Sequence, residues 1–131
     1  MQALHRRIDD LVAREGLPWE REGNRVTISF TRDGRSQVVH LARRDDRYRF
    51  HSIVANADDV GEDRRLLAFR IWRRNGLKPV VLFTLDDRDR VIGLINQPVE
   101  SMHAKELKFY LETLARECDR FEYILTGGDT W

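Results

Sequence analysis

The sequence predicts an α+β fold in which a mostly antiparallel five-stranded sheet packs with helices. Three observations lead to this. Apolar residues recur at helical spacing in three separate stretches, alternating apolar residues mark a group of three strands and a group of two, and short polar turns join strands within each group. The order is α-β-β-β-α-β-β-α. A chain of 131 residues is the size of one domain, so we assign residues 1–131 to a single domain.

The first helix is predicted over residues 3–15. Its apolar residues fall on one helical face, at Leu4, Ile8, Leu11 and Val12. Gly16 suits the C-terminal cap and Pro18 prevents the helix from resuming. Trp19 is then expected in a connecting loop.

Three strands should follow, in the segments NRVTISF, QVVHLA and RYRFHSIVAN. A hairpin centred on Asp33-Gly34 would pair Phe30 with Gln37 and Ile28 with Val39. A second hairpin, centred on Asp45-Asp46, would pair Leu41 with Phe50 and Val39 with Ser52. Both registers place the same apolar set on one face, as a real meander requires: Val26, Ile28, Phe30, Val39, Leu41, Tyr48, Phe50 and Val54.

The second half should contain a helix, two strands and a long helix. The polar link NADDVGEDRR leads into a helix that ends near Arg74, before Asn75-Gly76. The strands KPVVLFTLD and RVIGLIN follow, joined by a charged turn. The last helix is expected from about Met102 to Thr126, with Ser101 as its N-cap and Gly127-Gly128 at its end. A break at Asp119, followed by a sixth strand FEYIL, is the alternative.

Composition narrows the functional classes. The 23 basic and 22 acidic residues nearly cancel, so net charge favours neither nucleic acid nor membrane. One cysteine, Cys118, allows no disulfide within the chain and fits a reducing cytoplasm. The opening residues are too charged for a signal peptide, and no apolar run is long enough to span a membrane. We therefore expect a cytoplasmic protein.

The stretch from about Arg64 to Leu125 resembles the YbjN family and the related CesT-like chaperones of type III secretion. The resemblance lies in the succession RLLAFRIWRRNG, PVVLFTLDDRDRVIGLI and ESMHAKELKFYLETLARECDRFEYIL, whereas the first half agrees in element order. The resemblance implies a small cytoplasmic homodimer that binds other proteins without catalysis. Secretion chaperones usually have an excess of acidic residues, whereas this chain is nearly neutral. Its charge therefore fits a general YbjN-like binding role better than a role in secretion.

The candidate chemical sites are weak. His40 and His51 should lie opposite each other on neighbouring strands, but no third metal ligand is expected beside them. The acidic turns at 44–47 and 86–90 are interleaved with arginines, which favours solvated hairpin turns over a cation site. Cys118 falls on the apolar stripe of the last helix and is predicted to be a packed thiol. We therefore expect no enzyme activity, no cofactor and no metal.

The basic helix suggests a different partner. Between Glu62 and Lys78 the chain holds six basic and two acidic residues, and Arg70, Arg73 and Arg74 lie close to Trp72. Such a helix can grip phosphates and stack bases. A nucleic-acid-binding accessory protein that uses the arginine-rich helix 64–74 is therefore the alternative function, although no helix-turn-helix or RNA-binding sheet motif accompanies it.

The last two strands are apolar on both faces, which predicts that something covers their second face. Three helices covering both faces of a monomer would suffice. We favour a second copy of the chain, with a homodimer or partner interface that contains Leu66, Phe69, Arg70, Trp72, Arg73, Val80, Leu82, Val91 and Ile95. Apolar surface that the dimer leaves open would then bind a segment of a partner protein. The predicted function is a non-enzymatic, chaperone-like or regulatory adaptor.

Overall fold

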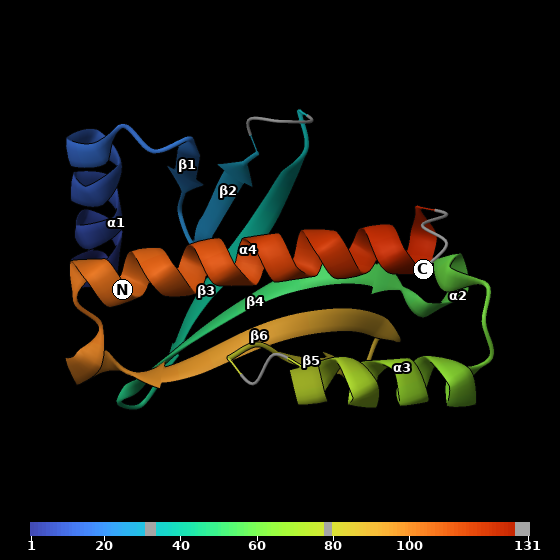
Figure 1. Ribbon diagram of the computed structural model, residues 1–131. Coiled ribbons are helices and arrows are strands. Elements are labelled where there is room, and N and C mark those ends of the chain that lie inside the picture. The colour runs from blue at the N-terminus through green and yellow to red at the C-terminus, as the bar shows by residue number, and fades with distance from the viewer. Residues whose placement is uncertain (31–33, 78–79, 128–131) are drawn as a thin grey trace.

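The computed structural model describes residues 1–30, 34–77 and 80–127 and confirms the α+β prediction (Figure 1). One antiparallel sheet has the strand order β1-β2-β3-β4-β6-β5. Its strands are β1 Trp19–Glu22, β2 Arg25–Ser29, β3 Ser36–Arg44, β4 Arg47–Asn56, β5 Leu82–Leu85 and β6 Arg90–Pro98. The helices are α1 Gln2–Glu15, α2 Ala57–Val60, α3 Arg64–Leu77 and α4 Ala104–Thr126, with a 3₁₀ turn at Val99–Ser101.

The sheet has one strand more than the five predicted. The additional strand, β1, lies where a loop was expected, and it pairs with β2 from Trp19 opposite Ile28 to Glu22 opposite Arg25. Trp19 is the one buried residue of this four-residue strand. A strand with a single apolar contact to the core has no alternation to detect in the sequence.

The first hairpin has a register that differs by two residues from the predicted one. Val26 lies opposite Val39 and Ile28 opposite Gln37, and the Phe30 N–H donates to the Arg35 carbonyl at 2.8 Å. Asp33, at the centre of the predicted turn, lies outside the described residues. Because side chains alternate with a period of two, a two-residue shift leaves the same residues facing the core. The predicted core face is therefore correct, although the predicted pairing is not.

The second hairpin has the predicted register only near its turn. Leu41 pairs with Phe50, and His40 with His51, but the paired residues end there. Beyond this point β3 and β4 diverge (Figure 1), so Val39 does not pair with Ser52. The Gln37 side chain crosses the gap and donates to the Ser52 hydroxyl at 2.7 Å and to the Ile53 carbonyl at 2.9 Å. The Ser52 hydroxyl in turn donates to the Val38 carbonyl at 2.6 Å.

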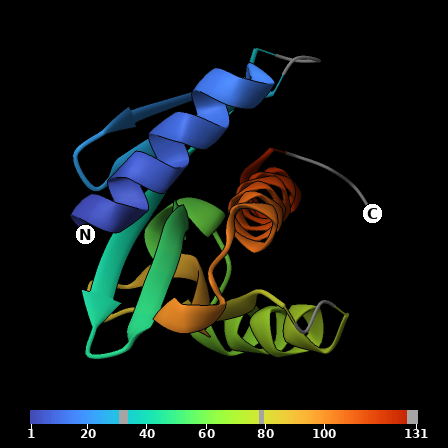
Figure 2. The same cartoon turned by 90° about the vertical axis from the view of Figure 1, so that its left-hand side faces the viewer.

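The three long helices contribute their buried side chains to one hydrophobic core on one face of the sheet. Helix α4 runs across that face (Figures 1 and 2). Helix α1 lies near the N-terminal half of α4, and α3 lies near its C-terminal end, on the other side of α4 from α1. Within the described residues, no helix is long and apolar enough to cross a membrane. The order of layers is thus a sheet covered by helices on one face.

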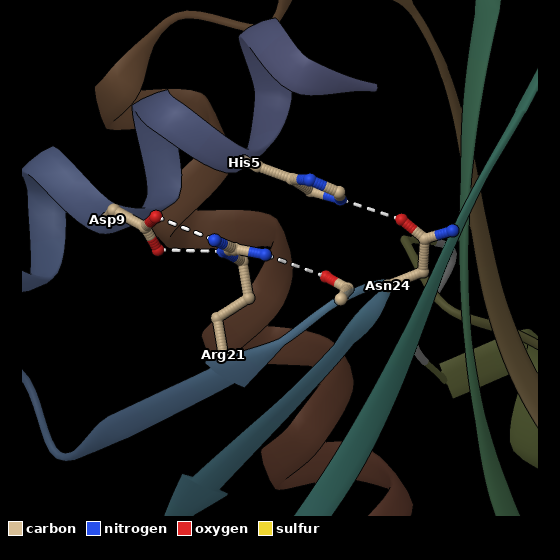
Figure 3. Close-up of polar contacts among 5 residues, drawn as sticks. His5, Asp9, Arg21 and Asn24 are labelled. Atoms are coloured by element: carbon tan, nitrogen blue, oxygen red, sulfur yellow. Dashed lines mark hydrogen bonds and ion pairs between the residues drawn. The ribbon is translucent and has the colours of Figure 1, made fainter.

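Helix α1 is tied to the β1–β2 hairpin by polar side chains (Figure 3). Arg21 donates from Nε and Nη2 to the two carboxylate oxygens of Asp9, both at 2.7 Å, and from Nη1 to the Gly23 carbonyl at 3.0 Å. This hydrogen-bonded arginine lowers the pKa of Asp9. A His5 ring nitrogen lies 2.7 Å from Asn24 Oδ1. These contacts fix the helix over the end of the sheet.

The helices of the second half differ in detail from the predictions. Helix α3 continues through Asn75 and Gly76 to Leu77, past the predicted end at Arg74. Helix α4 is continuous, so the alternative break at Asp119 with a strand FEYIL is wrong. Its N-cap is His103, whereas Ser101 lies in the preceding 3₁₀ turn and donates to the Pro98 carbonyl. Of its predicted glycine cap, Gly128 lies outside the described residues.

Candidate interaction surface on α3 and β5

Helix α3 is held against the edge of the sheet by one amide side chain. Asn75 Nδ2 donates to the Phe83 carbonyl at 2.9 Å, and the Phe83 N–H donates to Asn75 Oδ1 at 2.7 Å. Leu67 and Ile71, at steps of four before Asn75 and so on the same side of the helix, are buried in the core. Because these residues occupy one side of the helix, its remaining sides face away from the core.

Those remaining sides expose large apolar residues as well as arginines. Trp72 is 71% exposed, and its ring lies 5.9 Å from that of Phe69. The exposed large apolar residues of α3 and β5, with Val80 just before the strand, are Leu66, Phe69, Trp72, Leu77, Val80 and Leu82. Single exposed apolar residues are ordinary, but six on two adjacent elements form a patch, which is a feature of binding surfaces.

Two predicted members of this surface are placed wrongly. Val91 and Ile95 are buried in the core. The register explains the error, because Leu82 lies opposite Leu94 and Phe83 opposite Gly93. The apolar residues of β6 on the outer face are therefore Ile92, which is only 6% exposed, and Leu94, and neither was in the predicted interface. The sequence could not choose between the two faces, since both are apolar in both strands.

The outer face of the sheet is mixed in character. Paired strands bring together the outward-facing side chains of His40, His51, Ile53, Leu82, Ile92 and Leu94. Since the buried residues of all three long helices belong to the core on the other face, the predicted monomer with helices over both faces is not what the described residues form.

The exposed residues of α3 divide into two surfaces. Trp72 shares a helix side with Asn75, three residues on, and so lies toward β5. We define the edge surface as Phe69, Trp72, Val80 and Leu82. Turned toward α4 is a cavity of about 570 Å³, which we call the arginine groove. It is lined by Leu66, Phe69, Arg70, Arg73, Arg74, Leu77, Arg120, Phe121 and Ile124.

The two sides of the arginine groove come from segments that are distant in sequence. The side formed by α3 contains Leu66, Phe69, Arg70 and Arg73 of the predicted interface. The side formed by α4 contains Arg120, Phe121 and Ile124, none of which was in the predicted interface. Phe121 and Ile124 were predicted as part of a helix, but only the contact between α3 and the end of α4 places them beside the arginines.

Carboxylates neutralise two of the four groove arginines. Arg74 lies 2.9 Å from Glu117 in an ion pair whose side chains are 13% and 7% exposed, and its guanidinium stands over the Phe121 ring at 5.5 Å. Arg70 forms an ion pair with Glu62, and burial lowers the pKa of this arginine. Arg73 and Arg120 are exposed and form no ion pair within the part of the chain that the structure describes.

The other sequence candidates do not form a chemical site. The rings of His40 and His51 stack at 4.8 Å, and burial, followed by neighbouring positive charges, lowers the pKa of both. Across residues 1–30, 34–77 and 80–127, no group of three His, Cys, Asp or Glu side chains is placed to hold a metal. Cys118 is fully buried, and burial raises the pKa of its thiol. Asp86 accepts from the Arg90 side chain at 2.8 Å across its hairpin turn.

No protein-family model and no curated protein sequence matches the chain. Solved structures do match. The chain aligns with a structure of the ExsC–ExsE complex at a TM-score of 0.66 and 13% identity, over 98% of this chain and 97% of that one. The type III secretion chaperone SycH of Yersinia pestis, solved with a stable fragment of YscM2, matches at 0.57 and 17% identity, over 91% and 96%. YbjN from E. coli matches at 0.60 and 8% identity, over 93% and 88%.

The chain has the type III secretion chaperone fold. The predicted resemblance is thereby confirmed at the level of the fold. It extends over nearly the whole chain, beyond the Arg64 to Leu125 region from which it was inferred. Because a fold hosts many functions, the function has to be argued from the surfaces that α3, β5 and α4 present.

Proposed function

We propose that the protein is a non-enzymatic, chaperone-like or regulatory adaptor that binds a segment of a partner protein through apolar surface, and that it works as a cytoplasmic homodimer. The observation that carries this proposal is the exposed apolar patch on α3 and β5. Solved structures of the same fold include complexes of a chaperone with a second protein, such as SycH with its YscM2 fragment. Those complexes support protein as the kind of ligand.

The proposed dimer contact is the edge surface. Phe69, Trp72, Val80 and Leu82 are between 39% and 71% exposed. Each Å² of apolar area removed from water contributes about 25 cal/mol, so burying two copies of these side chains would oppose the cost of association. A two-fold axis would bring the same residues together from both copies. The backbone N–H and carbonyl of Phe83 already form hydrogen bonds with Asn75, so they are not available for pairing with a strand of a second copy. The dimer contact would therefore be made by side chains.

The charge arrangement favours protein over nucleic acid as the partner. Three arginines of α3 already have carboxylate partners: Arg64 with Asp89, Arg70 with Glu62, and Arg74 with Glu117. A helix that grips phosphates needs its cations available to the backbone of the nucleic acid. We therefore rank nucleic-acid binding by helix 64–74 behind protein binding.

The test is affinity capture from native-host lysate, with and without nuclease, identified by mass spectrometry. Three tagged forms are compared: the wild type, Phe69→Asp, and the matched control Phe109→Asp. Phe69 and Phe109 are 52% and 51% exposed, so both variants replace an equally exposed phenylalanine. We expect a discrete protein to be recovered with and without nuclease, and to be lost with Phe69→Asp alone. Recovery that disappears with nuclease would refute the proposal.

A further inference from the structure

We propose that the arginine groove binds an amphipathic helical segment of the partner protein in which a stripe of apolar side chains is flanked on both sides by carboxylates. The proposal rests on the proposed protein-binding function and specifies the chemistry of the ligand. Its evidence is the composition of the groove, the distribution of charge along its two sides, and the helical spacing of the residues on its α3 side.

The groove has an apolar interior large enough for several side chains. Its volume of about 570 Å³ is within the usual range for ligand sites, roughly 300–1,000 Å³. Leu66, Phe69 and Leu77 on α3, with Phe121 and Ile124 on α4, supply the apolar atoms. Leu66 and Leu77 are 48% and 69% exposed, so a bound segment would remove substantial apolar surface from water.

The unneutralised charges lie one on each side of the groove. Arg73 projects from α3 and Arg120 from α4, and neither forms an ion pair within the described chain. Arg70 and Arg74, in contrast, are matched by Glu62 and Glu117. A segment that fills the apolar interior would therefore meet one positive charge on each flank, and carboxylates at both flanking positions would complement them.

The geometry favours a helical segment. Leu66, Arg70, Arg73 and Leu77 follow one another at steps of four, three and four, so the α3 side of the groove is a continuous stripe. From Leu66 to Leu77 it extends roughly 16 Å, or three helical turns. A helix lying between two helices can present apolar residues at matching intervals, with charged residues at the flanking positions, as in a coiled coil.

Helix α3 of a second copy is a poor occupant of this groove. It contains Arg64, Arg65, Arg70, Arg73 and Arg74 and no acidic residue. Placed in the groove, it would bring arginines against Arg73 and Arg120, and like charges in contact oppose binding. The edge surface therefore suits the second copy, whereas the groove suits an acidic partner.

The experiment is a display selection with a random library of 16-residue peptides against the purified wild-type protein. Two variants test the charge rule directly: Arg73→Ala/Arg120→Ala, and the reversal Arg73→Glu/Arg120→Glu. Phe109→Asp is the control outside the groove, and circular dichroism verifies that each variant is folded. If the reversal does not fold, the alanine variant and the wild type still suffice.

We expect the wild type to enrich peptides with apolar residues at helical spacing and acidic residues on both flanks. The alanine variant should bind the selected peptides roughly 2–30-fold more weakly, the result of losing two exposed charge pairs. The reversed variant should enrich peptides with basic flanks, and Phe109→Asp should behave as the wild type.

Three results would overturn the proposal: no enrichment, enrichment without acidic flanks, or selected peptides that bind the alanine variant as tightly as the wild type. A fourth result would also overturn it: no peptide is selected, and a groove variant is monomeric where the wild type is dimeric. The groove of the wild type would then be occupied by a second copy of the chain. None of these results refutes the proposed function itself, because capture of a discrete protein by the wild type, with and without nuclease, tests that separately.

Discussion

The side-chain amide of Asn75 forms with Phe83 the two hydrogen bonds that a neighbouring strand would form. The Phe83 N–H donates to Asn75 Oδ1 at 2.7 Å, and its carbonyl accepts from Asn75 Nδ2 at 2.9 Å. β5 is the last strand on its side of the sheet. The contact thus orients α3 and also satisfies part of an exposed strand edge, which would otherwise invite pairing with another chain.

Replacing Asn75 with alanine should lower the free energy of unfolding by about 1–3 kcal/mol, because two hydrogen bonds are lost and the backbone groups of Phe83 lose their partners. Urea denaturation followed by circular dichroism measures this. Asn75→Asp keeps an acceptor for the Phe83 N–H but places a carboxylate against the Phe83 carbonyl, so it should also be destabilised. An alanine variant as stable as the wild type would mean that the contact does not hold α3.

Gly93 occupies a position in β6 where no side chain fits. A Cβ atom there would lie 2.5 Å from Cys118 Sγ, 3.1 Å from Phe83 Cε1 and 3.2 Å from Val81 Cγ1. Gly93→Ala should therefore destabilise the protein by about 1–3 kcal/mol through overpacking, as measured by the urea midpoint. Since Cys118 is the closest neighbour, the double variant Gly93→Ala/Cys118→Ala should be more stable than the sum of the single effects predicts. Strict additivity would contradict the proposed clash.

Cys118 should be chemically inert in the folded protein. Burial raises the pKa of its thiol, and the thiolate is the form that reacts. We expect a maleimide reagent to label Cys118 slowly in buffer and fast in denaturing urea, with the labelling rate rising through the unfolding transition seen by circular dichroism. Rapid labelling of the folded protein would contradict the packing of α4 against β4 and β6.

The stability of the fold should depend on pH through His40 and His51. Burial lowers the pKa of both histidines from the ordinary 6.5. Positive charges add to this effect: Arg25 and Arg90 act on His40, and His40 and Arg49 act on His51. Between the lowered and the ordinary pKa, the unfolded chain binds more protons than the folded one. The free energy of unfolding should thus be highest, as far as these histidines determine it, above about pH 6.5. It should fall as the pH drops below 6.5 and level off once the pH is below the folded-state pKa.

Urea midpoints at several pH values between 5 and 8 measure this dependence, where the range brackets the ordinary histidine pKa. In the double variant His40→Gln/His51→Gln, the decline below pH 6.5 should be reduced. If the double variant shows the same decline as the wild type, other groups are responsible.

The sequence predicted those features that depend on periodic burial. Apolar residues at helical spacing correctly indicated that the last helix is continuous, and all six are buried: Leu107, Leu111, Leu114, Cys118, Phe121 and Leu125. The alternation in β2, β3 and β4 correctly identified the core face, even where the register was shifted by two residues. These predictions succeed because a single face of each element meets the core.

The features that the sequence did not predict depend on tertiary contacts. Val91 and Ile95 were assigned to the wrong face because β6 is apolar on both sides, and only the pairing of Leu82 with Leu94 decides between them. The arginine groove needed the end of α4 to lie beside α3, which no local pattern in the sequence predicts. β1 has one buried residue, too few to form a pattern.

We propose that protein covers the exposed apolar surface on α3 and β5, beginning with a second copy of the chain at the edge surface. Multi-angle light scattering of the purified protein tests it most directly. The chain has a mass of 15.5 kDa. We expect twice that mass for the wild type and for the control Phe109→Asp, and the mass of one chain for Trp72→Asp. A wild type that is monomeric, or a Trp72→Asp variant that is still dimeric, would contradict it.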